Sequence, residues 1–426
     1  MQSVLEYIRK QWPETTRIHT ESEGTLIGLP YPYTVPCARD AFQEMYYWDT
    51  YFTCRGLALQ GETEQVLNNC RNFIHLLETR GFIPNGNRTY YLDHSQPPFF
   101  GALLDLCIRL RPGDRRLLSQ GVAALEKEMD FWKHHRRDRC GLEHYGSDAG
   151  TERKLEFYAC AVKRLGYPAD GDEATRLAAA REGLPEAESG WDFNPRFERS
   201  CPDFAPVDLN SLLWANRRLL AELHRELGDL DRADEWDSSA DTRAQLINRY
   251  CWSDSRGAFL DYNFRTRRHS PVFSAASLYP LWTGLATPEQ ALSTLRNAER
   301  LLECRHGIAC CEKYDSGHNY QWDYPNGWAP LQLIAIESFD RYGFRDAALR
   351  LAEKYVDLVS ANFHRTGDLW EKYNVVDGSI EAKSEYGTPR MMGWTAGVFV
   401  YAADYLEKNR RQRENSAGEV ERKPNP

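Results

Sequence analysis

The stretch QWDYPNGWAP, residues 321–330, joins a loop rich in glycine, proline and aromatic residues to an apolar helical segment at 326–342. The same alternation of loop and helix extends along the chain in both directions. About a dozen segments carry apolar residues three or four positions apart, the spacing of a half-buried helix, and few segments favour strands. Long loops inside a compact domain are usually functional. In this chain they cover residues 27–49, 82–99, 183–207, 304–328 and 366–393.

Two segments carry the clearest helical signals. Residues 63–79 place six apolar side chains on one face. In the segment that starts at Pro288, Thr287 can cap the first turn and Gln290 completes a capping box. Because no tight sequence repeat connects the helices, the pattern favours a helical toroid or a solenoid over a TPR-like array. The other helices are expected near 46–60, 97–111, 116–133, 208–228, 230–250, 326–342, 346–360 and 393–407.

The composition excludes several classes of protein. The chain has 426 residues, and a hydrophobic fraction of 42% allows a large core without disulfides or metals. The net charge of -9 argues against a nucleic-acid partner, which usually requires a basic surface. No run of 18 apolar residues exists, so no membrane span is expected. The tail from residue 408 to 426 lacks apolar periodicity and is expected to be disordered.

The cysteines and the N-terminus predict a cytoplasmic protein. Eleven cysteines, an odd number scattered through a long chain, favour reduced thiols over a disulfide framework. The first residues, MQSVLEYIRKQWPETTR, lack the apolar core of a signal peptide. Cys304, Cys310 and Cys311 lie close in sequence but lack the paired spacing of a zinc site, so no metal is expected. The oligomeric state stays open.

A tryptophan followed directly by a carboxylate recurs in the chain. Sugars have apolar ring faces and polar edges, so their sites pair aromatic side chains with carboxylates. Any single copy could be a buried tryptophan beside an acid that caps a helix, whereas four copies in loops or at helix starts favour a sugar site. A fifth copy, Trp236-Asp237, lies in a charged helical run and is expected on the surface. The four copies are Trp48-Asp49, Trp191-Asp192, Trp322-Asp323 and Trp370-Glu371.

Motifs of other chemistries are absent from the sequence. It contains no P-loop, no H-E-x-x-H zinc motif, no G-x-G-x-x-G fingerprint after a strand and no G-x-S-x-G elbow. Carboxylate chemistry without a cofactor is the remaining economical option. Hydrolysis of a glycoside requires one carboxylic acid that protonates the leaving oxygen and one carboxylate on the opposite side of the sugar.

Several segments resemble the α,α-trehalase family. QWDYPNGWAP at 321–330 and QEMYYWDTYFTCRGL at 43–57 resemble its two family motifs. The resemblance covers residues 25–405 and implies an all-α protein, an (α/α)6 toroid formed by a single domain of residues 1–407, with the active site in loops at one end. Further segments that match in the same order are IPNGNRTYYLDHSQPP at 83–98, ESGWDFNPRF at 188–197, PVDLNSLL at 206–213 and LWEKYN at 369–374.

The resemblance also implies an activity and its residues. It indicates an inverting glycosidase that cleaves trehalose or a close α-glucoside, with Asp192 as general acid and Glu371 as general base. The aromatic walls would be Trp322, Trp328 and Trp394. The other positions expected to contact the substrate are Arg39, Trp48, Asp49, Asn85, His94, Ser95, Gln96, Arg153, Glu156, Gly190 and Glu385.

Two departures from the family pattern bear on the substrate. Gln43 replaces one arginine of the family, with Arg39 as the candidate for another, and His94 replaces an arginine before Ser-Gln-Pro-Pro. Histidine lacks the fixed fork of donors and the permanent charge of arginine. A nearby arginine, Arg39 or Arg390, could supply the missing donor. The alternatives are a hydrolase of another small α-glycoside, such as a glucosylated or mannosylated acid or polyol, and a non-catalytic sugar-binding relative.

Overall fold

The computed structural model describes residues 1–39, 41–318, 320–381, 388–390 and 393–421. Within these residues, six helices form a closed ring in which each helix contacts the next and the last contacts the first. The (α/α)6 toroid expected from the sequence is therefore confirmed. The six inner helices are α2 (Tyr47–Leu59), α4 (Phe100–Leu110), α9 (Val207–Leu227), α11 (Tyr279–Thr283), α13 (Ala329–Arg341) and α15 (Gly393–Glu421).

A second layer of helices covers the ring, and the main apolar core fills the space between the layers. Each of the ten segments predicted to be helical contains a helix of the structure. The capping box also forms: Thr287 accepts from the main chain of Gln290, whose side chain accepts from Thr287 N–H. The outer helices are α1 (Gln2–Gln11), α3 (Thr63–Arg80), α5 (Arg115–His135), α10 (Leu230–Cys251), α12 (Pro288–Leu301) and α14 (Arg345–Thr366).

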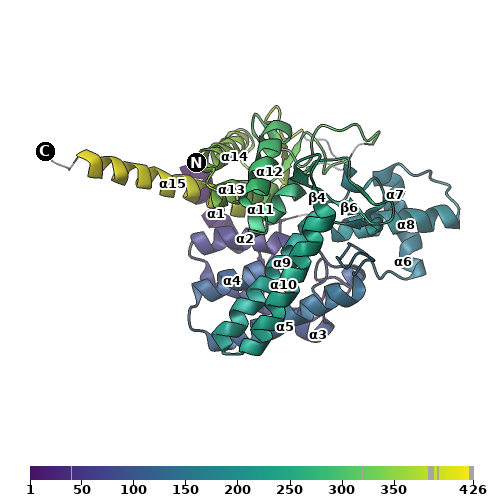
Figure 1. Ribbon diagram of the computed structural model, residues 1–426. Helices are drawn as coiled ribbons and strands as arrows, with labels where there is room; N and C mark the ends of the chain where they lie inside the picture. The colour runs from purple at the N-terminus through teal and green to yellow at the C-terminus, as the bar shows by residue number, and fades with distance from the viewer. Residues whose placement is uncertain (40, 319, 382–387, 391–392, 422–426) are drawn as a thin grey trace.

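Three helices lie in a part of the chain where the sequence indicated none: α6 (Thr151–Glu156), α7 (Tyr158–Leu165) and α8 (Glu173–Glu188). They lie together on the side of the molecule opposite the free end of α15 (Figure 1). A small apolar core of their own, which includes Phe157 and Leu184, holds them together. Their last helix leads directly into the Trp191-Asp192 segment.

The last helix of the chain, α15, extends from Gly393 to Glu421, and its last turns project from the body of the molecule (Figure 1). Arg410 pairs with Glu407 and Glu414, three and four positions away, at 2.8 and 3.2 Å. Such pairs support a polar helix that has no apolar stripe. None of the described helices is long and apolar enough to cross a membrane.

Short antiparallel strands join the loops at the ends of the helices. The pair that matters for the site is β10 (Asn326–Trp328) with β11 (Lys372–Asn374), in which Trp328 lies opposite Lys372. This pairing holds the QWDYPNGWAP loop beside Glu371. The other strands are β1 (Thr16–Arg17), β2 (Tyr33–Thr34), β3 (Phe204–Ala205), β4 (Trp252–Ser253), β5 (Ala258–Phe259), β6 (Tyr262–Asn263), β7 (Arg268–His269), β8 (Glu303–Cys304) and β9 (Gly307–Ile308).

Candidate active site

A pocket of about 340 Å³ lies where the amino ends of α2, α13 and α15 meet. Both predicted catalytic residues, Asp192 and Glu371, line it. Loops that are far apart in the sequence contribute to one wall, as expected for a site at one end of a toroid. The predicted substrate-contacting residues that line the pocket are Trp48, Asp49, Asn85, His94, Gln96, Arg153, Glu156, Gly190, Trp322, Trp328 and Trp394.

Tryptophans form a packed wall on one side of the pocket. Trp322 and Trp328 stack in parallel with ring centroids 3.8 Å apart and planes 4° apart. Trp394 stands edge-on to both, at 6.2 and 5.8 Å, and Trp48 lies 5.7 Å from Trp322. All four indoles are buried. They therefore act both as core anchors and as pocket lining.

Gly190 allows Trp48 to approach the chain just before the acid. Its φ of +72° lies in the left-handed region, which side chains other than glycine rarely adopt. A Cβ atom at this position would lie 2.9 Å from Cε2 of Trp48. The Gly-Trp-Asp sequence thus combines a turn, a buried anchor and an exposed carboxyl group.

Asp192 is held by an arginine that the sequence did not single out. Nη1 of Arg164 lies 2.9 Å from Oδ2 of Asp192, and Nη2 donates to the main-chain oxygen of Asp192 at 2.9 Å. Nε2 of Gln321 donates to the same oxygen at 2.8 Å. The side chain of Asp192 remains 31% exposed, so its carboxyl group is accessible to a ligand in the pocket.

Glu371 is buried and paired with a lysine. Nζ of Lys372 lies 2.6 Å from Oε2 of Glu371, and the side-chain exposures are 0% and 3%. The Lys372 ammonium also lies 4.9 Å above the centre of the Trp328 ring. Nε1 of Trp394 donates to the main-chain oxygen of Glu371 at 3.1 Å. The ammonium thus pairs directly with the Glu371 carboxyl group in a place that water reaches poorly.

Asp49 is a third carboxyl group in the pocket. Burial raises its pKa to about 8, and the negative charges of Glu371 and Asp192 add to the shift. At neutral pH, Asp49 is therefore mostly protonated. A protonated carboxyl group donates one hydrogen bond and accepts others, which suits a sugar hydroxyl.

His94 lies in the pocket wall as part of a charged cluster. Its Nδ1 lies 2.5 Å from Oδ1 of Asp93, and its Nε2 is buried without a hydrogen-bond partner among the described residues. Burial opposes ionisation of Asp93, but the hydrogen bond and charge of His94 outweigh it and lower the pKa of Asp93. Nε of Arg153 lies 3.5 Å from the other oxygen of Asp93. No sequence motif indicates Asp93 as a member of this cluster.

Two of the predicted substrate contacts, Ser95 and Arg39, do not line this pocket. Ser95 lies behind the pocket wall, where its N–H donates to Glu188 at 2.8 Å and its hydroxyl to the oxygen of Ile83 at 2.6 Å. Both of its polar groups serve the structure of the loop. Arg39 is exposed and, with Arg390, lines a separate cavity of about 560 Å³. Glu385 lies outside the described residues.

The fold and the pocket together define the class of the protein. A helical toroid whose end pocket combines carboxyl groups with a wall of indoles suits a glycoside hydrolase. The sequence model of the Trehalase family matches residues 1–407. The chain belongs to the trehalase family.

Individual relatives agree with this membership. A periplasmic trehalase from Escherichia coli (strain SMS-3-5) is 34% identical over 434 residues, which cover 95% of this chain and 74% of the relative. The solved structure of neutral trehalase Nth1 from Saccharomyces cerevisiae is 28% identical, with a TM-score of 0.76 over 97% of this chain and 82% of that one. A mannosylglycerate hydrolase from Thermus thermophilus is 17% identical with a TM-score of 0.62, covers 93% of this chain and 99% of its own, and shares the fold.

Proposed function

We propose that the protein hydrolyses trehalose with inversion at the attacked anomeric carbon. The observation that carries the proposal is the pairing of each of two carboxyl groups with its own cation in one pocket. Asp192 lies beside Arg164 and Glu371 beside Lys372. Membership of the trehalase family supports trehalose as the substrate.

Asp192 acts as the general acid. In its protonated form it gives its proton to the oxygen between the two glucose units while the bond from that oxygen to the anomeric carbon breaks. Asp192 becomes a carboxylate in this step, and Arg164 at 2.9 Å stabilises the new negative charge. The guanidinium therefore favours the state reached after proton transfer, where its stabilisation accelerates the reaction.

Glu371 acts as the general base. It takes a proton from a water molecule, whose oxygen attacks the anomeric carbon from the face opposite the leaving oxygen. Lys372 pairs with Glu371 at 2.6 Å and holds its carboxyl group in place. One trehalose and one water give two glucose molecules, one of which is released as the β anomer. Solvent then reprotonates Asp192 and accepts the proton from Glu371.

Asp49 and His94 position the sugar in this proposal. Protonated Asp49 donates to a hydroxyl group, and Nε2 of His94 offers the substrate a single polar atom in place of a forked donor. This limited donor set favours keeping a second candidate: a hydrolase of another small α-glycoside. Arg153 and Arg164, which line the pocket, replace Arg39 and Arg390 as the arginines that can bind a substrate there.

The test combines variants with product analysis. Asp192→Asn and Glu371→Gln should each lower kcat on trehalose by several orders of magnitude with an unchanged helical signal, because acid and base act in the transition state. Asp237→Asn is the matched control, since Asp237 also follows a tryptophan but pairs with Arg218 away from the pocket. Near-normal turnover of either catalytic variant would contradict the assignment.

Two further measurements complete the test. Proton NMR of the first product should reveal β-glucose from the attacked unit, whereas release of the α anomer alone would exclude inversion. A panel of α-linked disaccharides and α-glycosides of small acids and polyols decides the substrate. A kcat/KM that is higher for another glycoside than for trehalose would replace trehalose with that substrate.

We also propose a cytoplasmic location. All eleven cysteines lie among the described residues as thiols outside disulfides, and most of them are buried, which suits a reducing compartment. The E. coli relative is named periplasmic, so cell fractionation is the direct test. Recovery of the native protein in the periplasmic or secreted fraction would overturn this location.

A further inference from the structure

A second, larger cavity lies at the other end of the ring. Its volume is about 950 Å³, and the later parts of helices α2, α4, α13 and α15 line it. Helix α2 reaches both sites: Asp49 lies in the catalytic pocket and Arg55 in the second cavity. At 1.5 Å per residue, these two residues are about 9 Å apart along the helix axis. The second cavity is thus distinct from the catalytic pocket.

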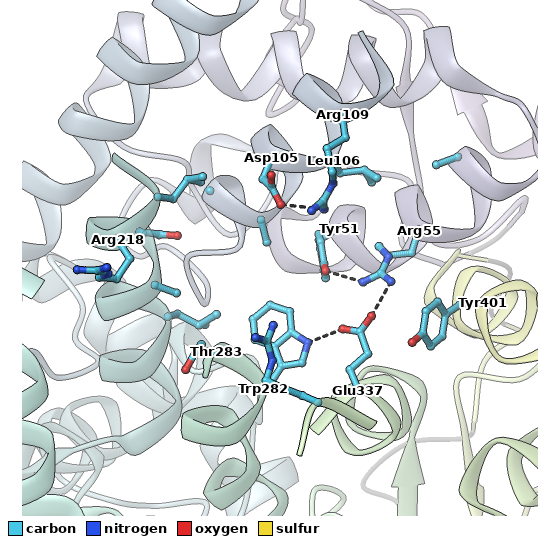
Figure 2. A pocket seen from close by; sticks show the side chains of 18 of the residues that line it. Tyr51, Arg55, Asp105, Leu106, Arg109, Arg218, Trp282, Thr283, Glu337 and Tyr401 are labelled. Atoms are coloured by element: carbon cyan, nitrogen blue, oxygen red, sulfur yellow. Dashed lines mark hydrogen bonds and ion pairs between the residues drawn. The ribbon is translucent and has the colours of Figure 1, made fainter. Parts of the chain in front are cut away.

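Half-buried polar side chains organise one wall of this cavity. Arg55 donates to Oη of Tyr51 at 2.8 Å and to Glu337 at 2.6 Å, and Nε1 of Trp282 donates to the other Glu337 oxygen at 2.6 Å. These groups point toward one another across the cavity wall (Figure 2). The Arg55 guanidinium also lies 4.7 Å from the centre of the Tyr401 ring. Because each group holds its neighbour, the wall is preorganised for a ligand.

Aromatic and small side chains complete the lining. Trp214 on α9 and Trp282 on α11 are both partly exposed and line the cavity. Two small residues, Ala102 and Ala215, also line the cavity. Flat apolar faces next to hydrogen-bonding groups suit a ligand with apolar ring faces and polar edges.

The charges around the cavity balance. Five basic and five acidic side chains line it, so an anion or a cation gains no net attraction. A neutral ligand with many hydroxyl groups can accept from the guanidinium groups and donate to the carboxylates. The basic residues are Arg55, Arg109, Arg218, Arg341 and Lys408, and the acidic residues are Asp105, Glu222, Glu337, Asp340 and Asp404.

From these features we infer that the cavity is a second sugar-binding site, for a neutral mono- or disaccharide that is bound without being cleaved. A buried aromatic ring connects it with the catalytic pocket. Phe99 stacks on Tyr51 at 5.1 Å, contacts Trp282 at 5.6 Å and reaches Trp48 of the catalytic pocket at 6.2 Å. Sugars at the two sites therefore contact opposite ends of one aromatic cluster.

The experiment labels the whole protein with 5-fluorotryptophan and titrates it with D-glucose, followed by fluorine NMR. Single Trp→Phe variants assign the resonances of Trp214 and Trp282 in the second cavity and of Trp48 in the catalytic pocket. We expect the Trp282 and Trp214 resonances to shift in a saturable manner with a midpoint that differs from that of Trp48. If the second cavity does not bind glucose, only the Trp48 resonance shifts. If the catalytic pocket is assigned wrongly, only the Trp282 and Trp214 resonances shift.

A variant that fills the cavity provides the second arm. Ala215→Phe adds a ring in the open space and leaves the Arg55–Glu337–Trp282 contacts in place. It should weaken glucose binding reported by Trp282 by about tenfold or more, because the added ring occupies the ligand volume, and change the Trp48 midpoint by less than about twofold. Any of three results would overturn the inference. The Trp282 and Trp214 resonances of the wild type would not shift, the Trp282 midpoint would be the same in the variant, or sodium phosphate would cause equal shifts.

Discussion

Nη1 of Arg164 lies 2.9 Å from Oδ2 of Asp192 while Nη2 of the same guanidinium donates to the main-chain oxygen of that residue. One side chain thus fixes both the backbone and the carboxyl group of the proposed acid. The arginine comes from α7, a helix that packs outside the ring of inner helices. Helices α6–α8 therefore contribute side chains to the candidate site.

Replacement of Arg164 tests this role. Arg164→Gln should lower kcat by about tenfold to a hundredfold with a smaller effect on KM, because a charge-assisted hydrogen bond to the carboxylate formed in the reaction is lost. Arg164→Lys keeps the charge without the fork and should recover part of the rate. The control is Lys163→Gln, an exposed neighbour on the same helix. Steady-state kinetics decide, and a change confined to KM would count against a role in the chemical step.

A methyl group at Gly190 should damage the site more than the fold. Gly190→Ala has to adopt φ near +72° and places Cβ 2.9 Å from Trp48, so the indole must shift. The matched control is Gly81→Ala, where φ is +78° and no atom lies within 4 Å of the new Cβ. Both should lose about 1 kcal/mol of stability or more from the backbone. Only Gly190→Ala should also lower kcat/KM, and equal activity of the two variants would contradict the proposed contact.

The raised pKa of Asp49 predicts a pH-dependent stability. The folded state holds a proton on Asp49 up to about pH 8, whereas an unfolded Asp loses it near pH 3.9. Between these values the folded protein binds more protons, so the free energy of unfolding falls as pH rises. Asp49→Asn removes this dependence, and its stability relative to wild type should increase with pH by up to about 1.4 kcal/mol per unit.

Denaturant unfolding of both proteins between about pH 5 and 7 measures this difference. Burial also raises the pKa of Glu128 to about 8. Its contribution is common to both proteins, so the difference isolates Asp49. A stability difference that does not vary with pH would mean that Asp49 is ionised in the folded protein.

His94→Arg tests the most informative departure from the family pattern. Arginine places a permanent charge beside Asp93 and adds donors that reach into the pocket, so trehalose kcat/KM should rise by about tenfold relative to other α-glucosides. The control is His144→Arg, at a histidine outside the pocket. Parallel kinetics on the same substrates measure the ratio. An unchanged or reduced preference would indicate that Arg153 already supplies the donor.

The sequence predicts some helices better than others for a physical reason. Helix α3 buries a continuous stripe of large apolar side chains, and α12 starts with a capping box, so both signals can be read locally. Helix α8 instead buries small residues such as Ala179 and Gly183, together with Pro185. Such residues produce no apolar stripe, which explains why the sequence indicated no helix there.

The residues of the candidate site also divide into those that a local sequence pattern predicts and those that it does not. Asp192 and Glu371 stand in recognisable aromatic segments and line one pocket. Arg164 is one of two adjacent basic residues near the end of α7, and Asp93 is a single acid in a loop. Their roles depend on contacts between distant segments, so no local pattern could reveal them. Ser95 was misplaced because its neighbours His94 and Gln96 line the pocket while its own polar groups face inward.

The indole wall has an optical consequence. Trp322 and Trp328 stack 3.8 Å apart, and Trp394 stands nearly perpendicular to both. Chromophores this close do not absorb light independently, because their electronic transitions couple. The near-ultraviolet circular dichroism of the protein should therefore carry a band that arises from the site itself. That band offers a label-free record of whether a variant or a change of solvent has disturbed the pocket before any substrate is added.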